Sequence, residues 1–200
     1  MIKNILTIFL LLILFTACST NQLSLNIEKK IEREKVSVEL LNEISFILVL
    51  LKQNNLEVIN SKLINPKFGV YKVYKDDNTN KITFTHSLQI DETSNEVDSF
   101  EIKQEVVTFN CSPDNDAFYG WSKEGTFLTP YIKPYLSKIM NEENKININK
   151  YKEDELKRVE LIEKTSYELI VTYNKIFYLT KIDNNWYITL IDEVKTNCSK

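Results

Sequence analysis

The sequence is poor in the residues from which most catalytic and metal centres are built. Its 200 residues include one histidine, 3 cysteines, 3 glycines and 4 prolines. One histidine, His86, without a second histidine or a free thiolate to accompany it, does not complete a usual zinc-binding set. The sequence also lacks a Gly-x-Ser-x-Gly elbow, and Ser122 stands outside that context. We therefore expect no catalytic residue, no metal and no cofactor.

An excess of positive charge is also missing. The chain has 25 basic and 28 acidic residues, a formal net charge of −3, without a basic stripe. Since nucleic-acid binding depends on clustered Lys and Arg, nucleic acid is not an expected partner. Hydrophobic residues make up 43% and aromatic residues 11% of the chain, which is enough for a packed core and is untypical of disordered chains.

The first eighteen residues form the one long hydrophobic segment. Lys3 gives a positive start, an apolar run follows from Ile5 to Phe15, and the small residues Thr16 and Ala17 precede Cys18. This order resembles a bacterial lipoprotein signal peptide that is cleaved before a lipid-modified cysteine. The run is short for a permanent membrane span, which needs about 20 apolar residues. An ordinary secretory signal, or an uncleaved anchor with an incidental Cys18, is the alternative.

The resemblance implies a cellular location and a lipid anchor. The thiol of Cys18 would carry diacylglycerol, so the chain would be attached to a membrane by lipid. Phe15 departs from the leucine that usually occupies this position, whereas Ser19 is not the aspartate that retains Gram-negative lipoproteins in the inner membrane. We therefore expect a cell-envelope protein of the outer membrane that faces the periplasm.

The sequence predicts three parts of the chain. Residues 1–17 are the expected signal peptide, and residues 18–35 are polar and highly charged, which predicts a tether. Residues 36–200 have the length of a single domain. Once Cys18 is acylated, Cys111 and Cys198 are the cysteines that remain, and in an oxidising compartment such a pair is expected to form a disulfide. Two unpaired small hydrophobic residues are the alternative.

Hydrophobic periodicity predicts helices first and strands afterwards. Apolar residues at three- and four-residue steps predict a helix from Val36 to about Asn54 and a second, short helix that ends before Pro66. A third helix is predicted over Thr126–Met140, and 141–150 is polar. Alternation or apolar runs predict the strands: Phe68–Val73, Ile82–Ile90, Phe100–Phe109, Val159–Ile162, Tyr167–Tyr173, Ile176–Ile182 and Trp186–Val194.

This order predicts an α+β fold, with N-terminal helices packed on a curved, mostly antiparallel sheet and one further helix. The turn Asn65–Val70, a tryptophan-containing loop that leads into a helix, and the final hairpin Ile182–Ile188 resemble the nuclear-transport-factor-2-like, or SnoaL-like, group. The resemblance extends over about Val36 to Val194, and several uncharacterised bacterial lipoproteins share the pattern. It implies a cone-shaped fold that can enclose a pocket.

Three features are candidates for chemistry. Alternation places His86 on the apolar face of its strand, where a hydrogen-bonded core imidazole is favoured over a pocket base or ligand. The segment Asp114–Asp116 suggests calcium, but the sixth position from Asp114 is Tyr119 instead of the glycine of a calcium loop, so a solvated turn is favoured. Tyr119 and Trp121, in an irregular loop, belong to the core or to a binding surface.

The resulting expectation is a lipid-anchored envelope protein that is not an enzyme. Its α+β domain would bind a small apolar ligand or another envelope protein. One alternative is a hydrolase or isomerase with a cone pocket lined by His86, a possibility that fold analogy alone suggests. The other is a purely structural lipoprotein, which would show a filled cone and an exposed apolar patch.

Overall fold

The protein structure is a computed structural model that describes residues 36–77, 79–89, 97–112, 118–129, 135–173 and 175–198. The chain divides into two units, Met1–Glu34 and Lys35–Lys200, and every helix and strand described below belongs to the second. The expected signal peptide lies outside the described residues, as does the tether up to residue 35.

Helix α2, Val38–Gln53, lies within the predicted range and begins two residues after the predicted start at Val36. The hydroxyl of Ser37 accepts a hydrogen bond from the N–H of Leu40 and so caps the first turn. Asn54 ends the helix in the left-handed conformation, with φ 50°. A short helix α3, Leu56–Val58, continues into a π-helical segment, Ile59–Leu63, which stops before Pro66 as predicted.

Seven strands form the main sheet, in the order β2-β1-β9-β8-β7-β6-β3. Their bounds are β1 Val70–Asp76, β2 Thr79–Thr85, β3 Ile102–Lys103, β6 Thr126–Thr129, β7 Tyr167–Val171, β8 Ile176–Ile182 and β9 Asn185–Asp192. The pairs β1–β9 and β3–β6 are parallel, and the other four pairs are antiparallel. The sheet is open. Strands β4 Phe109–Asn110 and β5 Gly120–Trp121 form a separate antiparallel hairpin.

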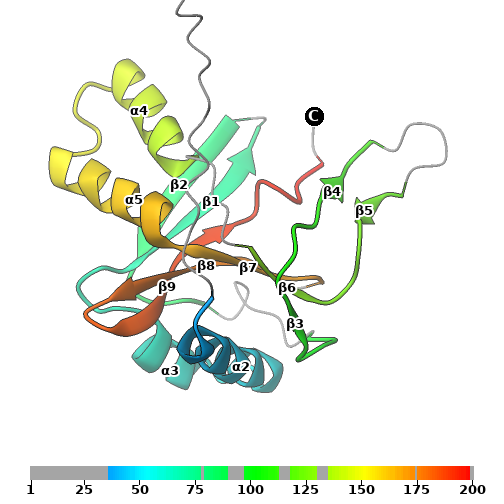
Figure 1. Cartoon of the computed structure of the whole chain (residues 1–200). Helices are drawn as coiled ribbons and strands as arrows, with labels where there is room; N and C mark the ends of the chain where they lie inside the picture. The colour runs from blue at the N-terminus through cyan, green and yellow to red at the C-terminus, as the bar shows by residue number, and fades with distance from the viewer. Residues whose placement is uncertain are drawn as a thin grey trace, which may run out of the picture. The chain divides into compact units, whose positions relative to one another are not determined.

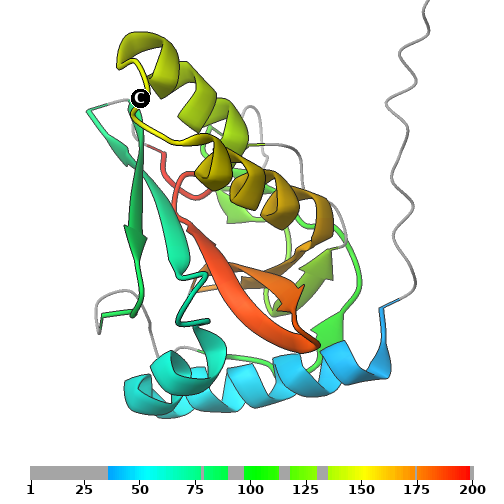
Figure 2. The same ribbon diagram turned by 90° about the vertical axis from the view of Figure 1, so that its left-hand side faces the viewer.

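Helices cover both faces of the sheet (Figures 1 and 2). Helix α2 and the segments that follow it pack on one face, and helices α4, Leu136–Ile146, and α5, Glu153–Thr165, pack on the other. The continuous apolar runs of β7 and β8 follow from this arrangement, because alternate side chains enter opposite cores. Leu169 and Phe177 face α2, whereas Ile170 and Ile176 face α4 and α5.

The region between β5 and β7 corrects two sequence predictions. The predicted helix Thr126–Met140 is wrong at its start, because residues 126–129 form β6, fully buried between β3 and β7. The predicted strand Val159–Ile162 is wrong, because it lies within α5. Val159 and Ile162 are three residues apart and share the buried face of that helix, and Glu153 to Glu155 place negative charge at its N-terminus.

Two helices therefore stand where one was expected, and a buried carboxylate joins them. Glu163 of α5 accepts hydrogen bonds from the backbone N–H groups of Tyr135 and Ser137, at 2.7 and 2.8 Å, and from the Ser137 hydroxyl at 2.6 Å. It thus satisfies donors at the N-terminus of α4, which has no capping side chain of its own. The α+β class is as predicted.

Candidate functional site: an aromatic groove beside the C-terminal segment

Aromatic residues of the β4–β5 hairpin lie beside Tyr173 and Thr196, which come much later in the sequence. The ring of Phe109 lies edge-on to that of Trp121, with centroids 5.1 Å apart, and 6.5 Å from that of Tyr119. With other residues they line a cavity of about 450 Å³, here called the aromatic groove. Its lining residues are Phe109, Tyr119, Gly120, Trp121, Glu124, Tyr173 and Thr196.

Two tyrosines of the groove are exposed to solvent. Tyr119 is 66% and Tyr173 55% exposed, which is unusual for large aromatic side chains in a packed domain. The hydroxyl of Tyr173 donates a hydrogen bond to the carboxylate of Glu124, and this bond raises the pKa of the tyrosine. Thr172, beside Tyr173, exchanges hydrogen bonds with the backbone of Gly125, at 2.8 and 3.1 Å. The loops on either side of the groove are therefore tied together.

Residues 193–198, here called the C-terminal strap, provide one wall of the groove through Thr196. The Asp192 carboxylate fixes the start of the strap, because it accepts hydrogen bonds from the N–H groups of Val194 and Lys195, at 2.9 and 3.1 Å. The N–H of Glu193 donates to the carbonyl of Val73 on β1, at 2.9 Å.

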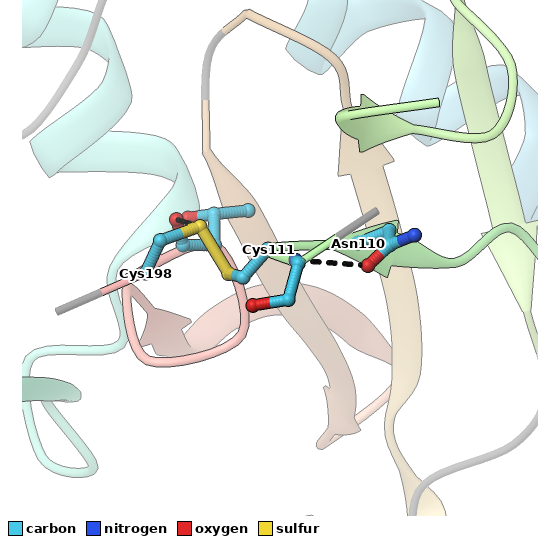
Figure 3. Close-up of a disulfide and its surroundings, with 5 residues drawn as sticks. Asn110, Cys111 and Cys198 are labelled. Atoms are coloured by element: carbon cyan, nitrogen blue, oxygen red, sulfur yellow. Dashed lines mark hydrogen bonds between the residues drawn. A yellow bond between two sulfur atoms is a disulfide. The ribbon is translucent and has the colours of Figure 1, made fainter. Parts of the chain in front are cut away.

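A disulfide between Cys111 and Cys198 fixes the end of the strap (Figure 3). The two Cα atoms are 5.2 Å apart, within the range that such a bond requires. Cys111 directly follows β4, where the side chain of Asn110 accepts a hydrogen bond from the N–H of Ser112 at 3.0 Å. The cysteine pair expected from the sequence thus joins the strap to the aromatic hairpin.

A smaller, charged pocket of about 220 Å³ adjoins the groove and shares Trp121 and Thr196 with it. Lys175, Asp192 and Glu193 supply its polar groups. The Glu193 carboxylate pairs with the ammonium groups of Lys175 and of Lys72, the latter at 3.4 Å. The two cavities therefore offer an aromatic surface beside a set of hydrogen-bonding and charged groups.

A buried polar cluster underlies the strap. The hydroxyl of Tyr178 lies 2.9 Å from the Glu168 carboxylate and 3.4 Å from the Asp192 carboxylate. The ammonium of Lys195 contacts Glu168 and lies 2.7 Å from the Tyr178 hydroxyl. Glu168, Tyr178 and Asp192 are buried, whereas Lys195 is partly exposed. A strap residue thus neutralises charge on the sheet.

Burial determines the electrostatics of this cluster. It raises the pKa of Asp192 above its ordinary 3.8, although Lys195 and the N–H groups of Lys195 and Val194 act in the opposite direction. Burial and the nearby carboxylates of Glu168 and Asp192 raise the pKa of Tyr178 well above 10. The Tyr178 hydroxyl therefore stays protonated at neutral pH and donates hydrogen bonds to the carboxylates. The contact of Lys195 with Glu168 holds the strap on this cluster.

The structure does not place His86 as the sequence predicts. We expected a buried residue on the apolar face of its strand, but His86 is exposed, and its ring lies edge-on to Phe84 with centroids 5.0 Å apart. β2 is the edge strand and ends at Thr85, and Phe84 on the same face is itself 41% exposed, so the core does not cover the face that the alternation marks as apolar. Leu88 is buried as predicted.

The other sequence candidates are distributed differently. Tyr119 and Trp121 lie together in the groove, whereas Cys18 and Asp114–Asp116 lie outside the described residues. Within the described part of the chain, no group of three or more His, Cys, Asp or Glu is arranged to hold a metal ion. Among the same residues, no helix combines the length and apolar character needed to cross a bilayer.

Sequence reasoning missed three contributors to the site. Tyr173 was assigned to the end of a strand, whereas it lies beyond β7 in a turn with φ 66°. Glu168 and Asp192 lie within predicted strands, and no role was predicted for them. A charged residue inside an otherwise apolar strand is the signal that identifies them, because an acid at such a position needs a buried partner.

Comparison of the chain with protein-family models, with curated proteins and with solved structures finds no match.

Proposed function

We propose that the protein is a lipid-anchored envelope protein whose domain binds a small, largely apolar ligand in the aromatic groove. The observation that carries this proposal is the exposure of Tyr119 and Tyr173, both of which line a cavity of about 450 Å³. That volume suits a small molecule. Tyrosine and tryptophan provide apolar area at a low cost in side-chain entropy, which is the reason for their frequent use in binding surfaces.

The charged pocket adds a polar end to the proposed ligand. An apolar ring or chain would lie against Phe109, Tyr119 and Trp121, while a polar group would reach Lys175 or Glu193 in the adjoining pocket. The disulfide and the Lys195–Glu168 contact hold the wall between the two cavities. Such preorganisation favours binding, because less conformational entropy is lost when the ligand enters.

The membrane part of the proposal is supported by the leader alone. The order Lys3, apolar run, Thr16-Ala17 and Cys18 resembles a lipoprotein signal, with the outer membrane as the expected destination. The nuclear-transport-factor-2-like cone is likewise a proposal, supported by the α+β order and the C-terminal strand meander. Our placement of the ligand does not depend on it, because the groove lies at the β4–β5 hairpin.

Another envelope protein is the second candidate for the occupant. Phe118, 46% exposed, lies next to Tyr119, so the hairpin also presents aromatic area outside the groove, as hot spots of protein interfaces do. The enzyme alternative needs a pocket lined by His86; His86 is exposed just beyond the end of β2, and this alternative stays a prediction.

Fluorescence from one tryptophan tests the groove. The chain has two tryptophans, and Trp186 is nearly buried against Tyr167, so Trp186→Phe leaves Trp121 as the reporter in the groove. The probe is the amphipathic fluorophore anilinonaphthalene sulfonate, which accepts energy from tryptophan. We expect saturable binding with energy transfer from Trp121, and at least a tenfold weaker affinity after Tyr119→Ser or Tyr173→Ser.

Phe46→Ser is the matched control. Phe46 is also an exposed aromatic residue beside a cavity of similar size, but it lies on α2 and not in the groove. The control should leave the affinity and the energy transfer unchanged. Binding without energy transfer from Trp121, or an equal loss of affinity in the Phe46→Ser and Tyr119→Ser proteins, would contradict the groove as the binding site.

A further inference from the structure

The turn between α4 and α5 exposes two isoleucines at its apex. Ile146, the last residue of α4, is 80% exposed, and Ile148 is 86% exposed. Single exposed apolar residues are ordinary, but these two are separated by one residue in a tip at one end of the helical layer (Figure 1). Two large aliphatic side chains exposed to this extent and this close together form a candidate contact site.

The turn is held in shape from within. The side chain of Asn144 accepts a hydrogen bond from the N–H of Tyr151 at 2.8 Å and donates one to the Tyr151 carbonyl at 3.1 Å. The Tyr151 hydroxyl donates to Glu143, and burial together with this bond raises its pKa to about 12. Asn149, with φ 61°, makes the reversal possible. The isoleucines are therefore presented by a braced turn.

Lysines surround the isoleucines. Lys145 precedes Ile146, and Lys150 and Lys152 follow Ile148. Residues 145–150 contain no acid, and of the acids that flank them Glu143 pairs with Lys150 at 2.7 Å, Glu142 with Lys138 at 4.0 Å and Glu153 with Lys157 at 2.6 Å, while Asp154 and Glu155 lie in the first turn of α5. The tip thus combines an apolar apex with ammonium groups at its base, the arrangement that suits an anionic bilayer surface.

We propose that the α4–α5 tip, residues 145–150, is a membrane-contact site that inserts Ile146 and Ile148 shallowly into an anionic lipid surface. The proposal rests on the membrane location proposed above. The tip would fix which face of the domain turns toward the membrane.

A second copy of the chain is a less suitable occupant. Two isoleucine side chains bury far less surface than the roughly 1,200 Å² of a specific protein interface. A symmetric contact between two tips would also bring Lys145 and Lys150 of one copy against the same residues of the other. Like charges would then oppose the contact, whereas anionic headgroups would favour it.

Sedimentation with lipid vesicles tests the proposal. We use the chain from Ser19 onward, which contains the whole unit Lys35–Lys200 and both of its hydrophobic cores. It should bind vesicles of phosphatidylcholine and phosphatidylglycerol in equal parts, and phosphatidylcholine alone more weakly. The double variant Ile146→Asn/Ile148→Asn should lower the partition coefficient at least about tenfold, whereas Lys145→Gln should weaken binding to the anionic vesicles alone.

Val106→Asn is the matched control, because Val106 is also an exposed aliphatic residue but belongs to another segment. It should leave partitioning unchanged. Ile148→Trp adds a direct readout, since its fluorescence should shift to the blue when vesicles are added. Absence of binding to anionic vesicles, equal binding by the double variant, or self-association that the double variant abolishes would each overturn the proposal. None of these measurements involves Cys18 or the aromatic groove, so their failure is distinguishable from failure of the proposed function.

Discussion

Loss of the bond between Cys111 and Cys198 should destabilise the whole domain and not only the strap. The bond joins the end of the chain to β4, 87 residues earlier, so it encloses β5 to β9 and both helices of the α4–α5 layer. When the domain unfolds, this crosslink still restricts the chain. The double variant Cys111→Ser/Cys198→Ser removes the restriction, which increases the entropy of the unfolded state.

The loop length sets the magnitude. For a loop of 87 residues, the chain-entropy relation gives about 4.6 kcal/mol at room temperature. Residual structure in the unfolded chain reduces this figure, so we expect a loss of about 2 to 4.6 kcal/mol in the free energy of unfolding. For a domain of this length, the corresponding fall in melting temperature is on the order of 5–15 °C.

Urea unfolding of the chain from Ser19, with and without a thiol reductant, measures the effect. Reductant should lower the midpoint of the wild-type protein to that of the double Ser variant, and it should not change the midpoint of the variant itself. The double variant should also bind the fluorophore more weakly, because Thr196 lies two residues before Cys198 and lines the groove. Two titratable thiols in the non-reduced protein, or equal midpoints with and without reductant, would refute the reasoning.

Two further predictions concern Asp192 and Cys18. Burial raises the folded-state pKa of Asp192 above 3.8, so the native state binds a proton more tightly than the unfolded state, and the contribution of this group to stability falls as the pH rises through that window. Asp192→Asn should keep the hydrogen bonds from the N–H groups of Val194 and Lys195, and its stability relative to wild type should rise as the pH increases above about 3.8, by at most about 1.4 kcal/mol per pH unit. A difference in urea unfolding that does not change with pH would contradict this. Cys18→Ser should release the protein from membranes during cell fractionation, and retention after high-salt washing would contradict lipid anchoring.

Local sequence signals predicted most of the elements of the fold. Helix α2 was predictable because its apolar residues recur at helical spacing and Asn54 marks its end; the cap at Ser37 fixes a start two residues later than predicted. The β8–β9 hairpin was predictable because Asp183 and Asn184 tolerate the positive φ angles that its turn requires, 48° and 67°. In both cases the residues that determine the structure are neighbours in sequence.

The errors arise where distant partners determine the structure. Residues 126–129 are a strand because β3 and β7 flank them on both sides, a fact that no local pattern contains. His86 is exposed because β2 is the edge strand of the sheet and the face that carries Phe84 and His86 is not covered, which the alternation of the sequence does not reveal. The groove could be predicted in part, from Tyr119 and Trp121, but its other walls come from Tyr173 and Thr196, which tertiary contacts bring there.

The way in which the strap is attached depends on the redox conditions of the compartment. Its start is fixed by hydrogen bonds to Asp192 and by the contact between Lys195 and Glu168, but Lys195 is partly exposed, and water and salt weaken such a pair. The end of the strap is fixed by a covalent bond to the hairpin that carries Trp121. Under reducing conditions Thr196 would be held from one side only, and the domain would lose a large part of a typical stability of about 5–15 kcal/mol. The disulfide thus fits an oxidising environment, the compartment expected from the resemblance of residues 1–18 to an export signal.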